Sequence, residues 1–195
     1  MTATAAEIRT LLARAYVADP LLTWVFQDDE DRLEATAAWL GVSVERHLEV
    51  GEVEHVREDG ELAAVALWRR PGTVLAGPPG QLPTAGGLLQ AIVGADRAAD
   101  IAAGFAAAPR LPDDVPAAYL HFLAVAPDAQ GRGLGGRLLD RVVARTRADG
   151  VLLRLDTTNP ANLPFYRAHG LVVRAEERLG PTGPRIWRLE TDVAR

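Results

Sequence analysis

The sequence of 195 residues contains no cysteine and no lysine, and all 21 positive side chains are arginines. Without cysteine there can be no disulfide, no thiolate–metal site and no covalent cysteine intermediate. Without lysine there is no side-chain amine to form a Schiff base or to be acetylated by the protein itself. These two absences exclude several common routes of covalent catalysis.

The chain also lacks a basic face and a long apolar run. Its formal net charge is −5 and like charges form no block, whereas a nucleic-acid partner usually needs a basic surface. No apolar run approaches the roughly 20 residues that span a bilayer, and residues 1–20 lack the basic-then-apolar order of a signal peptide. We therefore expect a soluble, cytoplasmic protein without a nucleic-acid or membrane partner.

The composition favours one folded domain without a metal site. Hydrophobic residues make up 48% of the chain, which allows a sizeable core. The length suits one compact unit, so we expect a single domain over residues 1–195. His47, His55 and His169 show no metal-ligand spacing with a carboxylate, and no metal cofactor is expected.

The first half of the chain is predicted to contain helices and one hairpin. Two β-type runs, 53–57 and 62–68, are separated by a short turn and predict a β-hairpin. The stretch 71–87 holds four prolines and five glycines and is predicted to be a loop. Asp19-Pro20 is expected to end the first helix. Apolar residues at helical spacing predict three helices, over residues 5–18, 31–49 and 88–107.

The second half is predicted to contain two buried strands joined by a helix. A nearly continuous apolar run is typical of a strand buried on both faces. Strand, helix and strand in close order predict a parallel crossover, so the fold class is α/β with a mixed sheet. The expected elements are a strand over 118–126, a helix over 134–148, a strand over 151–156, a short helix over 162–169, and strands over 171–177 and 186–190.

The turn between the first of these strands and its helix is rich in glycine. Gly131, Gly133, Gly135 and Gly136 carry no Cβ atom, so the backbone can approach a ligand closely. The first N–H groups of a helix have no partner within it, and the helix dipole is positive at that end. This pattern predicts a pyrophosphate site at the start of the helix, where Arg132 and Arg137 could add positive charge.

Three elements of this half resemble the GNAT superfamily of N-acetyltransferases. Residues 130–135 (QGRGLG) fit that family's Q/R-x-x-G-x-G/A loop, and residues 123–127 (LAVAP) resemble the strand that precedes it. Residues 159–171 (NPANLPFYRAHGL) resemble a second signature, in which a tyrosine follows an asparagine by seven residues and a glycine follows the tyrosine. Three elements in the right order are far more specific than a glycine motif alone.

The resemblance implies a central mixed sheet flanked by helices, with its strands splayed at an acetyl-CoA site. In that family the loop binds the pyrophosphate and the strand pairs with the pantetheine arm. The resemblance therefore implies acetyl-CoA as cosubstrate, an acetyl-CoA-binding half over 118–195 and an acceptor-side half over 1–117. The cofactor-binding residues it implies are Leu123, Ala124, Val125, Gln130, Gly131, Arg132, Gly133, Leu134, Gly135, Gly136, Asn162, Phe165 and Tyr166.

Weaker likenesses bear on the acceptor. Segments 63–68, 162–166 and 183–187 look like parts of puromycin N-acetyltransferase and its actinobacterial relatives, which favours a small-molecule amine. The family's acceptor pockets are often lined by the loop between the first two helices, which here carries Asp19, Trp24 and Phe26, although for Trp24 ordinary core packing is the favoured interpretation. The first 110 residues match only loosely, and the family leaves a homodimer open.

Acetyl transfer to an amine needs an oxyanion donor, an acceptor for the amine's proton and a proton donor for the leaving thiolate. Val125 lies where the family places a backbone N–H that polarises the thioester carbonyl. Tyr166 matches the position of the family's general acid. A phenol with an ordinary pKa of about 10 is protonated at neutral pH, so it can donate a proton to the thiolate. His121 alternates with Leu123 and Val125, which predicts one shared face, and is either a base or a structural histidine.

Three polar residues near the next strand have more than one interpretation. Asp156 ends that strand and could hold the amine's charge, act as the base or cap the following helix. We expect Asn162 to contact the cofactor and Asn159 to cap the short helix. The predicted reaction is direct attack of a primary amine on acetyl-CoA in a ternary complex, without an acyl-enzyme.

Two other functions fit part of the pattern. A GNAT-like module that binds acetyl-CoA without catalysis, as a sensor or partner, would keep the same loop. A dinucleotide-binding oxidoreductase would use Gly131, Gly133 and Gly136 as its G-x-G-x-x-G motif, with Asp156 twenty residues further on. Against the oxidoreductase, residues 127–130 separate the strand from the glycines, and the second signature is left unexplained.

Overall fold

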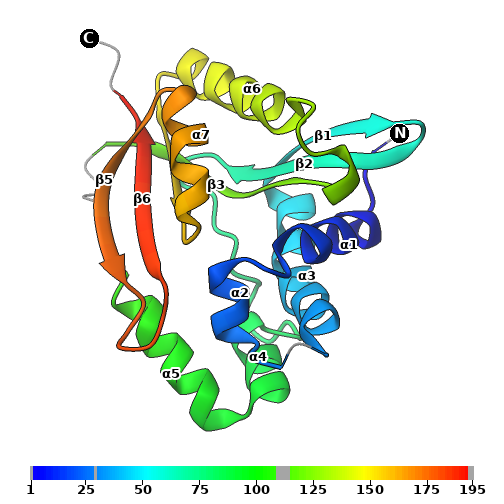
Figure 1. Cartoon of the computed structure of the whole chain (residues 1–195), viewed down its shortest axis with the longest axis vertical. Coiled ribbons are helices and arrows are strands. Elements are labelled where there is room, and N and C mark those ends of the chain that lie inside the picture. Colours follow the sequence, from blue (N-terminus) through cyan, green and yellow to red (C-terminus); the bar gives the residue numbers. More distant parts are fainter. Residues whose placement is uncertain (1, 29, 109–114, 193–195) are drawn as a thin grey trace.

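The computed structural model describes residues 2–28, 30–108 and 115–192. Among these residues the central element is a six-stranded sheet. Its strands are β1 (Glu52–Glu58), β2 (Glu61–Arg69), β3 (Ala117–Val125), β4 (Leu152–Thr157), β5 (Leu171–Arg178) and β6 (Arg185–Thr191). They lie in the order β1-β2-β3-β4-β6-β5, and all neighbours are antiparallel except β3 and β4 (Figure 1). The predicted α/β fold with a mixed sheet is confirmed.

Helices cover both faces of this sheet. The described α-helices are α1 (Ala5–Tyr16), α2 (Pro20–Val25), α3 (Arg32–Val50), α4 (Ala85–Val93), α5 (Ala95–Ala106), α6 (Leu134–Ala148) and α7 (Leu163–Ala168). One apolar core lies between the sheet and α6 and α7, and a second lies between the sheet and α1 and α3. A third cluster joins α2, α4 and α5 to the turn between β5 and β6. Figure 1 shows these layers on either side of the strands.

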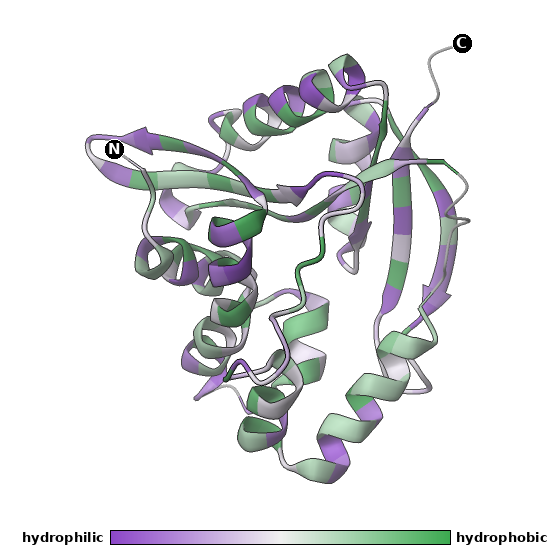
Figure 2. Ribbon diagram, turned by 180° about the vertical axis from the view of Figure 1, so that it is seen from behind, coloured by the Kyte–Doolittle hydropathy of each residue, from purple (hydrophilic) through white to green (hydrophobic). Residues whose placement is uncertain are grey.

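The centre and the edge of the sheet differ in hydropathy. Residues 62–68 of β2 are buried without interruption, as a strand covered on both faces must be. β5 alternates between partly buried and exposed residues after Leu171, because it lies at the edge of the sheet. Figure 2 shows the same contrast as continuous green on β2 and alternating bands on β5 and β6.

The helix after α1 was not predicted. The prediction placed a helix end at Asp19-Pro20, and α1 does end nearby at Tyr16. The same two residues also begin α2: Asp19 Oδ1 accepts the Leu21 N–H at 2.9 Å, and Pro20 takes the first helical position. A helix of six residues is too short to show helical periodicity, and the cap is its main local signal.

The predicted helix over 88–107 is two helices. α4 begins three residues earlier, at Ala85, because the Thr84 hydroxyl accepts the Gly87 N–H at 3.0 Å. Gly94 has a φ angle of 82°, outside the range of a right-handed helix, and separates α4 from α5. The other long predictions, 5–18, 31–49 and 134–148, correspond to α1, α3 and α6.

The two parallel strands separate after a few residues. Pairing between β3 and β4 runs from Ala117 to Leu120 on β3 and stops there, although both strands continue. The expected splay of these strands is therefore present. At the same point the register between β2 and β3 shifts by one, so that His121 is the extra residue of a β-bulge.

The bulge corrects one prediction. His121 was expected to share a face with Leu123 and Val125. Instead its ring packs 4.8 Å, between centroids, from His47 of α3, whereas Leu123 and Val125 pack against the core of α6. The extra residue interrupts the alternation of side chains, so His121 and its neighbour Phe122 both contact His47.

Candidate active site

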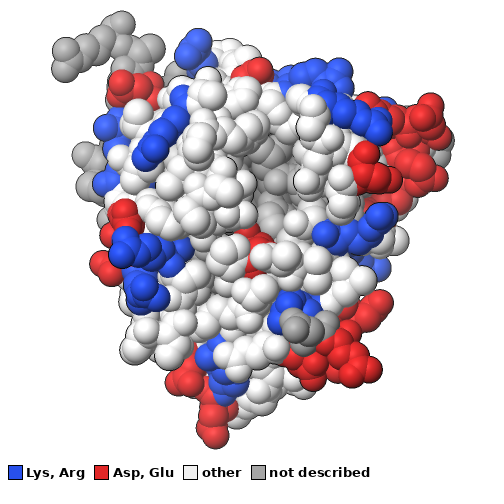
Figure 3. Space-filling view, viewed as in Figure 1, with Lys and Arg blue, Asp and Glu red and all other residues white. Residues whose placement is uncertain are grey.

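Two cavities lie at the gap between β3 and β4. The first, called the loop cavity here, has a volume of about 590 Å³ and lies against the glycine turn before α6. The second, called the inner cavity, has a volume of about 420 Å³ and lies on the side of α2 and α3. Figure 3 shows a hollow in the middle of the face drawn there, among mostly uncharged residues with acidic atoms just below it. The cavities meet at five residues that line both: Tyr16, Asp19, Leu123, Asn162 and Tyr166.

The loop cavity gathers nearly all residues that the sequence predicted for cofactor binding. Its lining includes Leu123, Ala124, Val125, Gln130, Gly131, Gly133, Leu134, Gly135, Gly136, Asn162, Phe165 and Tyr166. Arg132 is the exception, because its guanidinium forms an ion pair with Glu58 at 2.8 Å and donates to the Asp128 carbonyl at 3.1 Å. The positive charge of Arg132, expected beside the loop, is therefore held by acceptors outside the cavity lining.

The glycines of the turn meet two different geometric needs. Gly131 and Gly133 have φ angles of 77° and 74°, in the left-handed region that favours glycine. Gly135 is helical instead, and a Cβ atom there would lie 3.3 Å from Val125 Cγ2. The first two glycines shape the turn, and the third lets α6 start close to β3.

The start of α6 offers unpaired N–H groups to the loop cavity. Gly133 occupies the N-cap position, and no side chain caps the helix. The Arg137 N–H bonds to the Gly133 carbonyl, so the N–H groups of residues 134–136 have no partner within the helix. These residues line the cavity. With the positive end of a 15-residue helix behind them, they suit an anionic group such as a pyrophosphate.

Tyr166 lies in α7 where the two cavities meet. Only 8% of its surface is exposed. Burial, with a smaller contribution from the charge of Asp19, raises the pKa of Tyr166 to about 12. Phe165 packs against its ring in an edge-on arrangement, with centroids 5.2 Å apart. At neutral pH the phenol keeps its proton and can donate it to a group in either cavity.

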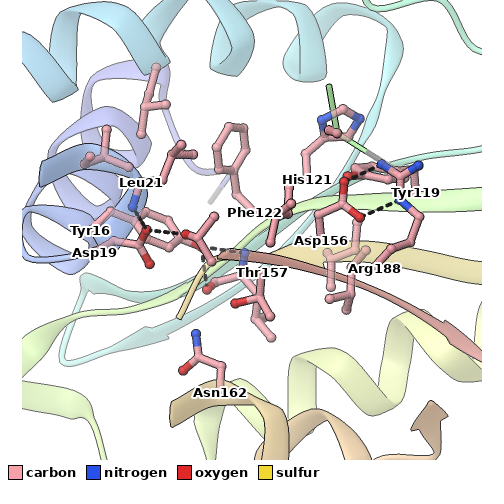
Figure 4. Close-up of a pocket in the computed structure, with 18 of the residues that line it drawn as sticks. Tyr16, Asp19, Leu21, Tyr119, His121, Phe122, Asp156, Thr157, Asn162 and Arg188 are labelled. Atoms are coloured by element: carbon pink, nitrogen blue, oxygen red, sulfur yellow. Dashed lines mark hydrogen bonds and ion pairs between the residues drawn. The ribbon is translucent and has the colours of Figure 1, made fainter. Parts of the chain in front are cut away.

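The two asparagines of the second signature differ in their contacts. Asn159 Oδ1 accepts the Ala161 N–H at 3.0 Å and begins the short 3₁₀ turn η2 (Pro160–Asn162), which is the expected cap. Asn162 makes no side-chain capping bond and lines both cavities. Figure 4 shows its amide directed from below toward the inner cavity.

Asp156 is engaged in an ion pair at the far end of the inner cavity. Its two oxygens accept hydrogen bonds of 2.6 and 2.5 Å from the guanidinium of Arg188 on β6. Burial and then the charge of Asp156 raise the pKa of the neighbouring Tyr119. Figure 4 shows Tyr119, Asp156 and Arg188 grouped together, and the paired charges of the last two cancel.

His121 lines the inner cavity but is a weak proton acceptor. Its Nε2 is buried and has no hydrogen-bond partner among the described residues. Burial, followed by the influence of His47 and Arg69, lowers the pKa of His121 to about 3. The imidazole is therefore neutral at physiological pH.

Two residues at the meeting point were not among the predicted catalytic or cofactor-binding residues. The Tyr16 hydroxyl donates to the Leu123 carbonyl at 2.9 Å and accepts the Leu123 N–H at 3.1 Å. The Asp19 carboxylate accepts the Thr158 hydroxyl at 2.9 Å, and burial raises the pKa of Asp19. Asp19-Pro20 carries a helix-start signal that could have indicated it. No local pattern indicates Tyr16, because Leu123 lies 107 residues away.

The remaining features that the sequence raised concern Trp24 and the described residues as a whole. Trp24 belongs to the third apolar cluster, as ordinary core packing would place it. In the described ranges no three His, Asp or Glu side chains come together as a metal site would require. None of the described helices combines the length and the apolar character needed to cross a bilayer.

Comparisons with known proteins agree with this geometry. Residues 83–171 match the Acetyltransferase (GNAT) family. The 5-NmdU N-acetyltransferase of Pseudomonas phage PaMx11 is 34% identical over 73 residues, which cover 37% of this chain and 51% of that protein. The match thus spans about half the length of this curated relative.

Solved structures share the fold over the whole chain. The histone acetyltransferase HPA2 and related acetyltransferase from Corynebacterium glutamicum has a TM-score of 0.67 at 25% identity, covering 100% of this chain and 96% of that one. Arylalkylamine N-acetyltransferase 2 from Aedes aegypti has a TM-score of 0.63 at 13% identity, covering 100% and 98%, which is a likeness of fold. Residues 83–171 thus resemble the GNAT acetyltransferase family, and the whole chain shares its fold with solved acetyltransferases.

Proposed function

We propose that the protein is an acetyl-CoA-dependent N-acetyltransferase that acetylates a primary amine of a small molecule. The observation that carries this proposal is the meeting of two cavities at Tyr166. One cavity presents helix N–H groups to an anion, and the other has room for a second molecule. Direct transfer needs two adjacent sites with a proton donor between them, because the reacting atoms must be held in contact.

Each step has a candidate group on the chain. When bound, acetyl-CoA supplies the activated acetyl group. The Gly131–Gly136 turn and the start of α6 would hold its pyrophosphate, and the Val125 N–H would polarise the thioester carbonyl. Tyr166 would donate its proton to the leaving thiolate. Because Asp156 is paired with Arg188 and the pKa of His121 is low, we assign these two to shaping and hydrogen bonding in the acceptor site.

The position of Asp156 favours this function over an oxidoreductase. A ribose-binding carboxylate should lie beside the glycine turn, whereas Asp156 lines the inner cavity and is paired with Arg188. The inner cavity also favours catalysis over a sensor module, since a module that only binds acetyl-CoA has no need of a second cavity reaching Tyr166. The name of the phage relative supports transfer to nitrogen, and the puromycin N-acetyltransferase-like segments favour a small-molecule acceptor.

Calorimetric titration with acetyl-CoA, and with NAD in a parallel cell, tests the loop cavity. We expect saturable binding of acetyl-CoA and none of NAD. Thiol release in the presence of an amine panel then tests catalysis, and the absence of cysteine means that a thiol reagent reports only free CoA. Binding of NAD alone would contradict the proposal, and acetyl-CoA binding without amine-dependent thiol release would indicate a binding module. Light scattering on the same sample tests the homodimer that the family leaves open.

A further inference from the structure

The inner cavity has a polar group at each end and apolar walls between them. Figure 4 shows Asp19 at one end, Tyr119, Asp156 and Arg188 at the other, and Phe122 between them. Asp19 also lines the loop cavity, whereas the far group does not. A molecule that spans the inner cavity would therefore present one end at Asp19, beside Tyr166 and the cofactor, and the other end at Arg188.

Asp19 is a partly buried carboxylate with no positive partner among the described residues. Within the described chain it forms no ion pair, and its two hydrogen bonds, from Thr158 and from the Leu21 N–H, both reach Oδ1. Burial raises the pKa of Asp19, which reflects the cost of keeping an isolated charge away from water. An ammonium group at the free Oδ2 would offset that cost, so this end of the cavity favours a cation.

The far end is polar but electrically neutral. The carboxylate of Asp156 and the guanidinium of Arg188 cancel each other in a two-bond pair, and His121 is neutral. A second charge on the bound molecule would lose its hydration without gaining a partner of opposite sign. An uncharged hydroxyl or carbonyl group could instead hydrogen-bond to Tyr119 or His121.

The walls between the two ends are apolar and partly aromatic. Trp39, Phe105 and Phe122 contribute rings, and Leu22 and Ile186 contribute aliphatic surface. The volume of about 420 Å³ falls within the roughly 300–1,000 Å³ of small-molecule sites. This space suits a body with one ring.

From these observations we infer that the acceptor is a primary monoamine with an apolar, ring-containing body and an uncharged polar tip, bound with its ammonium at Asp19. The inference rests on the proposed N-acetyltransferase function and names its substrate class.

The proton balance gives Asp19 a defined part. Its carboxylate takes one proton from the ammonium and passes it to solvent. The neutral nitrogen attacks the carbonyl carbon, the C–N bond forms, and the C–S bond breaks as the thiolate takes the Tyr166 proton. The second proton of the nitrogen returns to Tyr166, so one proton is released for each amide and each CoA formed.

An amine series tests the two ends separately. Tyramine has the expected form, 4-(2-aminoethyl)benzoate carries a negative tip, and p-xylylenediamine carries a second ammonium. With saturating acetyl-CoA we expect kcat/KM for tyramine to exceed both others by roughly 100-fold or more. Equal or faster turnover of either charged-tip amine would overturn the inference and leave the N-acetyltransferase function standing. No thiol release with any amine, despite acetyl-CoA binding, would overturn both.

Asp19→Asn tests the ammonium site without removing the cap of α2, because asparagine also accepts the Leu21 N–H. We expect KM for tyramine to rise roughly 30-fold or more, with Kd for acetyl-CoA within about threefold of wild type. Asp96→Asn removes the same charge at an exposed position of α5 outside both cavities, and should leave KM unchanged. Wild-type kinetics in Asp19→Asn would overturn the assignment.

Discussion

The loop cavity and the inner cavity share a boundary but are built in different ways. The loop cavity draws most of its lining from two short stretches, 123–136 and 159–166, and presents backbone N–H groups. The inner cavity draws on helices and strands from both halves of the chain and presents side chains. A site made of backbone N–H groups in one turn leaves a local pattern of glycines in the sequence. A site made of side chains from distant helices and strands comes together only when the whole chain folds. This difference explains why the sequence predicted the residues that line the loop cavity but not most of those that line the inner cavity.

The largest expected effect comes from the residue that both cavities share. Tyr166→Phe removes the proton donor for the thiolate but keeps the ring against Phe165. We expect kcat to fall by roughly 100-fold or more, the usual range for a general acid, while Kd for acetyl-CoA changes by less than about threefold. Single-turnover thiol release and calorimetry measure the two quantities. Wild-type turnover under conditions where chemistry limits the rate would rule out the general acid.

A change confined to the loop cavity should affect binding alone. Gly133→Val forces a β-branched side chain to a φ angle of 74°, a strain of about 1–3 kcal/mol. Movement of the turn to relieve this strain should raise Kd for acetyl-CoA roughly 10- to 100-fold. Gly80→Val is the matched control, since Gly80 has a φ angle of 84° in a loop outside both cavities. Equal affinities of the two variants would separate the turn from cofactor binding.

His121 in the inner cavity should make the free energy of unfolding depend on pH. The pKa of His121 is about 3 in the folded chain and about 6.5 when unfolded, so the unfolded state binds more protons between these values. Stability from the neutral imidazole is complete above pH 6.5 and is lost as the pH falls toward 3. Titration of one such group lowers the free energy of unfolding by about 2 kcal/mol between pH 7 and pH 5.

Urea unfolding at pH 7 and pH 5 measures this loss. His121→Leu should reduce the difference between the two pH values, and His47, whose pKa is also lowered by burial, should keep part of it. His55→Leu in β1 controls for loss of a histidine elsewhere. An unchanged difference in His121→Leu would show that this imidazole does not titrate as the structure implies.

The smallest effects should separate the two asparagines. Asn159 also lines the loop cavity, but its Oδ1 already accepts the Ala161 N–H. Asn159→Ala loses this cap of η2 and should lower the free energy of unfolding by about 1 kcal/mol, with little change in Kd for acetyl-CoA. Asn162→Ala should do the reverse, because the Asn162 side chain caps nothing and lines both cavities. Denaturant titration and calorimetry on both variants give the comparison, and an affinity loss in Asn159→Ala would reverse the two assignments.

Local interactions account for the parts of the fold that were predicted. The bounds of α6 were predicted correctly because its apolar stripe and the glycines at its start both lie within a stretch of about 20 residues. The side on which His121 lies was predicted wrongly, since its bulge arises from pairing with β2, more than 50 residues away. The Tyr16 contact with Leu123 joins residues still further apart. Periodicity shows which residues share a face only while the strand stays regular.

The splay between β3 and β4 has a consequence for aggregation as well as for ligands. Beyond Leu120, β3 has an open edge, and open strand edges invite pairing with another polypeptide. Here the Tyr16 hydroxyl occupies both backbone groups of Leu123, and the Gln130 amide donates to the Val125 carbonyl at 3.3 Å. These contacts leave fewer unpaired backbone groups with which a foreign strand could pair along this edge. The same two side chains that border a ligand site thus protect the sheet from unwanted pairing.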